Sequence, residues 1–183
     1  MCIRDRPGVD LVVDAHDLPF PDNSLRGIVM TNVLHHLGNA ERFFEECSRC
    51  LRPGGVVAMI EPWVSTWSKW VYTRLHHEPF DPAASQWEIP ESGPLSGANG
   101  ALPWILFERD RSRFEAAIPE LKVREVTPIM PFCYLVSGGV SMRSLMPSIT
   151  FPLWRFIEAA LHPWIRTWAM FARIVLVRGT CQG

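Results

Sequence analysis

Polar side chains that could bind a ligand stand directly after three apolar segments of the chain. Asp14 follows the run VDLVV at residues 9–13, Thr31 and Asn32 follow GIVM, and Glu61 follows VVAMI. Short, continuous apolar runs of this kind are typical of buried parallel strands. Ligands of open α/β sheets bind beyond the carboxyl ends of the strands. The three positions therefore predict a small-molecule site along one edge of a sheet.

Two histidine pairs add groups that can move a proton near neutral pH. His36, with His35 before it, follows the strand that ends at Thr31, and we take His36 as the first candidate for a general base. His35, Glu61, His76 and His77 are further candidates. The alternative for His76 and His77 is a polar patch on a helix that begins near Thr66.

The elements that would position these groups can be placed from caps and turns. Asn39 is a typical N-cap, and apolar residues at helical spacing predict a helix from there to Leu51 that Pro53-Gly54-Gly55 ends. A strand at 56–60 follows. Together with the strand at 27–31, this is a βαβ unit.

The rest of the chain predicts covering segments and a final pair of strands. A helix is expected at 111–118, and strands are expected at 121–131 and 172–177. Residues 62–110 and 135–170 are rich in Trp and Pro and are interpreted as cap or insert regions. We expect a single partial domain over 7–183, and we interpret residues 1–6, MCIRDR, as a non-native leader because they resemble no targeting signal.

Composition narrows the classes of protein. A net charge of −1 gives no sign of a nucleic-acid-binding surface, and 48% hydrophobic residues indicate a globular chain. Five cysteines argue against a disulfide framework. Cys47 and Cys50 form a CxxC inside the predicted helix with no second ligand pair, so no metal site is predicted.

The ordered set VDAHDLPF, GIVMTNVLHHL and LRPGGVVAMIEP resembles the class I S-adenosylmethionine-dependent methyltransferases, of the type 11 kind. The resemblance covers residues 7–62 closely and 121–178 in outline. It implies a Rossmann-like α/β sheet of order 3-2-1-4-5-7-6, and S-adenosylmethionine as the cofactor. The glycine-rich turn of this family and its strands 1 and 2 are missing before Asp14, so we expect a truncated chain that is inactive alone.

The same resemblance implies roles for particular residues. Asp14 and Ala15 fall where the family binds adenine, and Thr31 and Asn32 fall where it holds the methionine end of the cofactor. His16 is expected to bind the cofactor as well. Asp14 could instead be a simple turn cap. His36 would be the base for a hydroxyl acceptor, and the acceptor would lie near three further residues, Glu61, His76 and His77.

The aromatic segments suggest what the methyl acceptor is and whether the chain contacts a membrane. Residues 134–154 carry Arg143 as their one charge among apolar side chains, which suggests a hydrophobic or lipid-like acceptor, peripheral contact with a membrane, or a buried lid. Charges interrupt every candidate membrane span, and we expect a cytoplasmic protein.

Two other classes of function stay open. A nicotinamide-dependent reductase shares the βαβ unit, but neither Tyr72 nor Tyr134 has a Lys four residues later, as a short-chain dehydrogenase would. A non-catalytic, methyltransferase-like binding module is the other alternative. A glycine-rich turn upstream, and its exact spacing, would separate the three.

Overall fold

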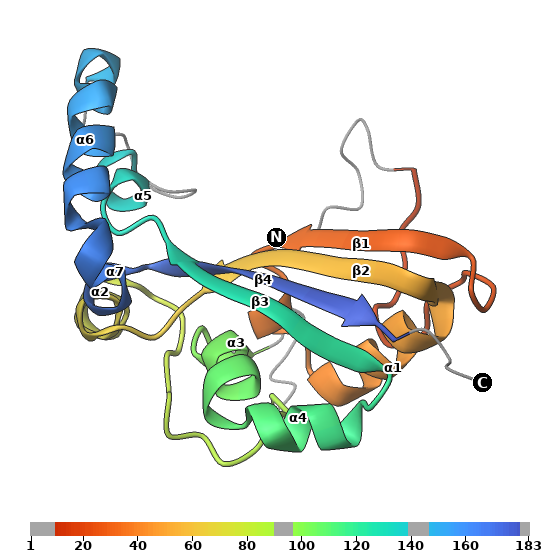
Figure 1. Cartoon of the computed structure of the whole chain (residues 1–183). Helices are drawn as coiled ribbons and strands as arrows, with labels where there is room; N and C mark the ends of the chain where they lie inside the picture. Colours follow the sequence, from red (N-terminus) through yellow and green to blue (C-terminus); the bar gives the residue numbers. More distant parts are fainter. Residues whose placement is uncertain (1–9, 90–96, 139–146, 180–183) are drawn as a thin grey trace.

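The computed structural model describes residues 10–89, 97–138 and 147–179 of the 183-residue chain. These residues form a mixed four-stranded sheet with helices on one face and at one end (Figure 1). The strands are β1 (Leu25–Thr31), β2 (Leu51–Pro62), β3 (Leu121–Ile129) and β4 (Phe171–Arg178), in the order β1-β2-β4-β3.

Strand direction changes once across the sheet. β1 and β2 are parallel, whereas β4 runs antiparallel to both of its neighbours, β2 and β3. The predicted α/β class is confirmed, and so is the antiparallel pair at the end of the chain. The complete order 3-2-1-4-5-7-6 has more strands than the described residues contain, and it stays a prediction.

Helix α1 (Ala40–Cys50) connects the two parallel strands and begins at the residue that the sequence indicated. The Asn39 side chain accepts a hydrogen bond from the amide of Arg42, which satisfies one of the free N–H groups of the first turn. Phe43, Phe44 and Cys47 lie on the buried face of the helix. Burial of this apolar stripe against the sheet holds α1 in place.

The main core lies between the sheet and the helices beneath it in Figure 1: α1, α3 (Leu102–Trp104) and α4 (Arg111–Ala117), with the π-helix η2 (Ile105–Arg109) joining the last two. Phe44, Phe107 and Phe114 meet there edge to face, with ring centroids 5.0–5.8 Å apart. This is the favoured geometry for aromatic pairs, and it fixes α1 against α4.

The sequence placed the end of α1 and the start of β2 incorrectly. The helix ends at Cys50, and the strand begins at Leu51, five residues before the predicted Val56. Pro53-Gly54-Gly55 lies within the strand, where the pairing with β1 jumps between Leu51 and Val56. Gly54 has a φ of +78°, so its left-handed conformation forms an irregular bulge and not a helix stop.

The predicted first strand is also wrong over its described part. Val9 lies outside the described residues, as does the predicted leader at 1–6, and residues 10–13 form no strand. Leu11, Val12 and Val13 are exposed by 40–58%. A strand needs a neighbour to satisfy its backbone, and among the described residues no strand lies beside this run.

One helix directly follows β2, and a group of short helices follows β3. Helix α2 (Thr66–Leu75) begins at a reciprocal capping box between Ser65 and Ser68. The group after β3 projects from the end of the sheet in Figure 1 and comprises α5 (Cys133–Val136), η3 (Ser148–Thr150), α6 (Phe151–Leu161), η4 (His162–Trp164) and α7 (Ile165–Trp168). Across the described residues, every helix is too short or too polar to cross a membrane.

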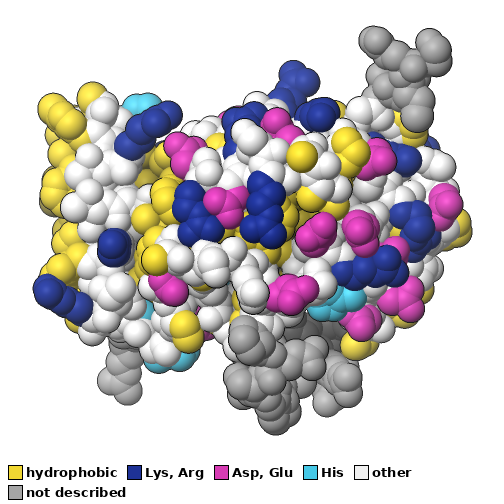
Figure 2. Space-filling view, turned by 90° about the horizontal axis from the view of Figure 1, so that it is seen from below, with side chains coloured by type: hydrophobic (Ala, Val, Ile, Leu, Met, Phe, Trp, Pro, Cys, Tyr) yellow, Lys and Arg dark blue, Asp and Glu magenta, His cyan; other side chains and the backbone are white. Residues whose placement is uncertain are grey.

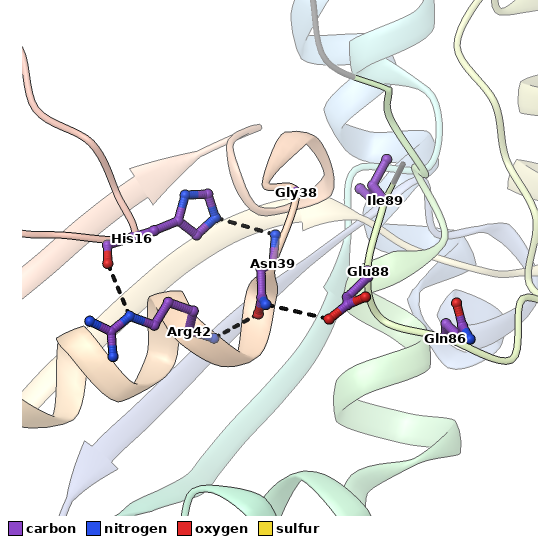
Figure 3. A pocket seen from close by; sticks show the side chains of 7 residues that line it. All are labelled: His16, Gly38, Asn39, Arg42, Gln86, Glu88 and Ile89. Carbon is purple, nitrogen blue, oxygen red and sulfur yellow. Dashed lines mark hydrogen bonds between the residues drawn. The ribbon is translucent and has the colours of Figure 1, made fainter. Parts of the chain in front are cut away.

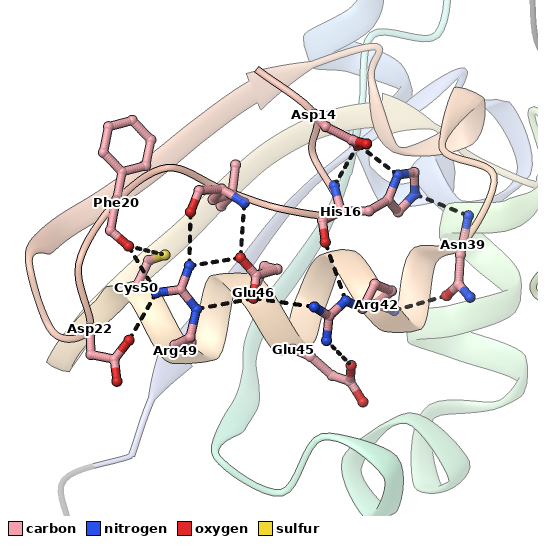
Figure 4. Close-up of polar contacts among 11 residues, drawn as sticks. Asp14, His16, Phe20, Asp22, Asn39, Arg42, Glu45, Glu46, Arg49 and Cys50 are labelled. Atoms are coloured by element: carbon pink, nitrogen blue, oxygen red, sulfur yellow. Dashed lines mark hydrogen bonds and ion pairs between the residues drawn. The ribbon is translucent and has the colours of Figure 1, made fainter.

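A partly buried ion pair on α1 holds the loop that precedes β1 (Figure 4). The guanidinium of Arg49 donates to both carboxylate oxygens of Glu46 at 2.8 and 3.0 Å, and to the backbone oxygens of Leu18 and Phe20 at 2.8 Å. Glu46 also accepts a hydrogen bond from the amide of Leu18. The side chains of Glu46 and Arg49 thus pair with backbone groups of a loop that belongs to no strand.

This ion pair predicts a loss of stability in acid. Hydrogen bonds from Arg49 lower the pKa of Glu46 to about 2, from an ordinary value of 4.5. The folded chain therefore binds this proton more weakly than the unfolded chain, and the stabilisation is complete above about pH 4.5 and lost as the pH falls through about 2.

Urea unfolding at about pH 5 and about pH 3 would measure the effect. Glu46→Gln removes the titrating group, so its unfolding midpoint should change less between the two pH values than that of the wild type. Equal pH dependence of the two proteins would contradict the assignment.

Candidate functional site

The carboxyl ends of β1 and β2 meet at one edge of the sheet, as the sequence predicted. Thr31 pairs with Ile60, and the amide of Asn32 donates to the Ile60 oxygen at 3.0 Å. Asn32 and Glu61 therefore directly follow the two residues of the last β1–β2 pair, Thr31 and Ile60. The 3-10 helix η1 (Leu34–His36) starts just beyond Asn32 and carries both histidines of the first pair.

Glu61 lies beneath this edge and holds η1 in place. Its side chain is fully buried, and one carboxylate oxygen accepts from the amides of Val33 and Leu34 at 2.8 and 2.9 Å. The other oxygen lies 2.7 Å from Nδ1 of His35. Because both oxygens contact the chain itself, the geometry gives Glu61 a positioning role in place of the substrate contact expected from the sequence.

His35 and His36 are adjacent but differ in environment. Burial alone would lower the pKa of His35, but its contacts with Glu61 and Glu78 raise that pKa to about 9. The pKa of His36 is lowered, chiefly by burial and then by the charge on His35. The side chain of His36 is 39% exposed, against 3% for His35. Of the two imidazoles, that of His36 is therefore the more accessible to a ligand.

The carboxylate of Glu78 lies close to all four histidines of the two predicted pairs. Its oxygens lie 3.6 Å from Nε2 of His35, 3.8 Å from Nε2 of His36, 3.9 Å from Nδ1 of His76 and 3.8 Å from Nε2 of His77. The neighbouring imidazoles lower the pKa of Glu78 to about 2, with His35 contributing most. Sequence reasoning brought out the histidines but missed this carboxylate.

Asn32 presents a buried acceptor at the same edge. Its backbone is left-handed, with a φ of 53°, and its side-chain oxygen is buried with no hydrogen-bond partner among the described residues. Buried polar atoms are nearly always paired. An orphaned acceptor at a strand end therefore indicates a site for a donor group. Thr31 beside it is exposed.

The predicted adenine contact, Asp14, lies in an exposed turn before β1. Its carboxylate accepts from the amide of His16 at 2.9 Å and lies 3.0 Å from Nδ1 of the same residue, and the first of these contacts contributes most to lowering the pKa of Asp14 (Figure 4). Nε2 of His16 accepts from the amide of Asn39. Ala15 packs against the main core. The turn is thus anchored to the start of α1.

A cavity of about 420 Å³ opens beside this turn (Figure 3). That volume is within the usual range for small-molecule sites. Among the five residues predicted to bind the cofactor, His16 lines it. The other lining residues come from the start of α1 and from the loop after α2, and they are Gly38, Asn39, Arg42, Gln86, Glu88 and Ile89.

Apolar side chains are exposed at the end of the molecule that carries α6. Figure 2 shows hydrophobic side chains along that edge and charges of both signs over the rest of the view. Ile149 and Phe156 are 86% and 71% exposed. Three more large apolar side chains of this segment are exposed by about half: Phe151, Leu153 and Trp164.

Comparison with known proteins places residues 3–59 in the family model of a methyltransferase domain. A protein of Mycolicibacterium smegmatis described as a probable S-adenosylmethionine-dependent methyltransferase is 44% identical over 46 residues, which are 25% of this chain and 18% of the relative.

A solved structure shares the fold over nearly the whole chain. It is a chain of the complex between the Trm112 methyltransferase activator of Haloferax volcanii and a proposed methyltransferase. The TM-score is 0.50 at 17% identity, with 94% of this chain and 62% of the other covered. The present chain thus spans less than two thirds of the length of either relative.

Proposed function

We propose, from the premise that this chain belongs to the class I S-adenosylmethionine-dependent methyltransferases, that the ends of β1 and β2 form part of a methyl-transfer site. The observation that supports this most is the orphaned side-chain oxygen of Asn32. A cationic amino group, such as that at the methionine end of the cofactor, is the donor that such an acceptor fits.

The residues that would hold the cofactor lie on both sides of this acceptor. Asn32 and Thr31 would hold the methionine end, while Asp14, Ala15 and His16 would meet the adenine. Asp14 is exposed and so can accept from an amino group in addition to its own turn. When bound, S-adenosylmethionine supplies an electrophilic methyl group on its sulfonium. The task of the chain is then mainly alignment of donor and acceptor.

His36 would act as the general base for the methyl acceptor. Its half-exposed imidazole lies on η1, directly after the cofactor-facing strand, and it can accept a proton from a hydroxyl nucleophile. Glu61 keeps η1 in position through the amides of Val33 and Leu34. His76 and His77, on the far side of Glu78, would border the acceptor.

The acceptor itself is proposed to be hydrophobic or lipid-like. The support is the group of exposed apolar side chains from Ile149 to Trp164 at one end of the molecule. An apolar helix face of this kind can contact an apolar ligand or the surface of a membrane. Peripheral membrane contact by α6 is therefore part of the proposal.

Substitution of Asn32 by glycine tests the cofactor site. Glycine adopts a positive φ without strain, so Asn32→Gly removes the side chain and preserves the backbone. A hydrogen bond to a charged donor contributes about 1.5–3 kcal/mol, so we expect affinity for S-adenosylhomocysteine to fall about 10- to 100-fold.

The measurement is calorimetric titration of the purified chain with S-adenosylhomocysteine. Asn23→Gly is the matched control, because Asn23 also has a positive φ of 55° but lies at the other end of β1. Unchanged affinity in Asn32→Gly would overturn the assignment. Absence of binding to the wild-type chain would favour the non-catalytic binding module.

A further inference from the structure

The carboxylate of Glu78 faces two adjacent imidazoles from a different part of the chain. The ligand atoms of His35, His36 and Glu78 all lie within 4.8 Å of one another. The rings of His35 and His36 are 4.1 Å apart between centroids and tilted by 39°. Both Nε2 atoms belong to η1, and both approach the same carboxylate, which the loop after α2 supplies.

The spacing fits a shared cation better than direct hydrogen bonds. The closest approaches, 3.6 and 3.8 Å, exceed the usual N–H···O distance. Zinc binds imidazole nitrogen and carboxylate oxygen at about 2.0–2.2 Å, which places two ligands of a tetrahedral ion roughly 3.4 Å apart. Small side-chain rotations would bring the three groups to that geometry.

Glu61 supplies the support that a metal-binding histidine requires. A ligating imidazole almost always donates its other N–H to a carboxylate or carbonyl, which fixes the tautomer and the direction of the ring. Nδ1 of His35 donates to the buried carboxylate of Glu61 at 2.7 Å, and this leaves Nε2 directed towards Glu78. Glu61 is itself held by the amides of Val33 and Leu34.

We propose that His35, His36 and Glu78 form a binding site for a divalent transition-metal ion of the zinc class. Two imidazoles and one carboxylate suit zinc and its neighbours, whereas magnesium and calcium prefer oxygen ligands. Three protein ligands leave a fourth position for water or a ligand. The site goes beyond methyl transfer, because these side chains can bind a cation without the cofactor. A bound cation would occupy His36, so ligation and proton acceptance are alternative states of that side chain.

Titration of the metal-free chain with zinc, in competition with a chromophoric chelator, tests the proposal. The chain is purified without a histidine tag. We expect one equivalent of zinc to bind, and cobalt in its place to give the visible absorption of a tetrahedral site. His36→Ala and Glu78→Gln should each weaken zinc binding at least about tenfold, and Glu61→Gln about 10- to 100-fold.

His162→Ala is the matched control, because His162 is exposed and lies in η4, outside the cluster. Its zinc affinity should equal that of the wild type. Failure to bind one equivalent of zinc overturns the proposal, and so does binding that persists in both His36→Ala and Glu78→Gln. Each of these results is independent of the affinity for S-adenosylhomocysteine, so the metal site and the methyl-transfer site can fail separately.

Discussion

Replacement of Glu61 by alanine is expected to destabilise the chain by about 3–5 kcal/mol, because removal of one partner strands the other members of a buried charged network. The carboxylate is fully buried and accepts hydrogen bonds from two backbone amides in addition to its contact with His35. Alanine leaves those three donors without an acceptor, and a buried unsatisfied group costs about 1–3 kcal/mol. The start of η1 should therefore loosen together with the overall loss of stability.

Urea unfolding followed by tryptophan fluorescence would measure this loss. Glu125→Ala is the matched control, since Glu125 lies on β3, is 40% exposed and pairs with Arg173 at the surface. Exposed ion pairs contribute at most about 1 kcal/mol. If the two alanine variants were equally stable, the buried network would not hold the strand edge as the geometry indicates.

Glu61→Gln should fall between the wild type and the alanine variant. A glutamine oxygen can still accept from the amides of Val33 and Leu34, but the side chain no longer carries the charge that pairs with His35. The difference between the two Glu61 variants thus separates the support of η1 from the pairing with His35.

The sequence predicted the strand edge because the rule behind that prediction is local and geometric. Parallel strands joined by a helix end at the same edge of a sheet, so the positions of Asn32 and Glu61 along the chain were enough to place them together. The cap at Asn39 could be predicted in the same way, because capping depends on one side chain and the amide of Arg42 three residues later.

The predictions that failed depended on neighbours that the local sequence does not show. The run at 9–13 is apolar enough for a strand, but a strand forms only where another strand pairs with it. Pro53-Gly54-Gly55 can end a helix or form a bulge. Because Leu25 already pairs with Leu51, these three residues lie inside the strand and form a bulge.

Glu78 was missed for a different reason. It follows His76 and His77 directly, and such a polar stretch at a helix end is ordinarily exposed to solvent. Its meeting with His35 and His36 depends on how the loop after α2 folds back to η1. Periodicity and caps carry no information on that path, so the one carboxylate common to both histidine pairs had no signal in the sequence.

Replacement of Arg49 by methionine is expected to destabilise the chain by about 2–3 kcal/mol. Methionine fills similar space but leaves the carboxylate of Glu46 buried, with the amide of Leu18 as its remaining hydrogen-bond donor and the guanidinium of Arg42 3.9 Å away. Two backbone oxygens of the loop, those of Leu18 and Phe20, lose the same donor. The expected loss is smaller than for Glu61 because the side chain of Arg49 is 34% exposed and water can partly replace it.

Arg42→Met is the control on the same helix, because Arg42 is 52% exposed and forms its closest ion pair with the exposed Glu45. It should change the free energy of unfolding by less than about 1 kcal/mol. Glu46→Gln should offset part of the loss in Arg49→Met, because a neutral amide is less costly to leave without the guanidinium. Strictly additive effects of these two substitutions would show that the ion pair does not couple α1 to the loop before β1. In that case the hydrogen bond from the amide of Asn39 to His16 and the apolar contacts of Ala15 with the core would hold the turn at Asp14 against the helix.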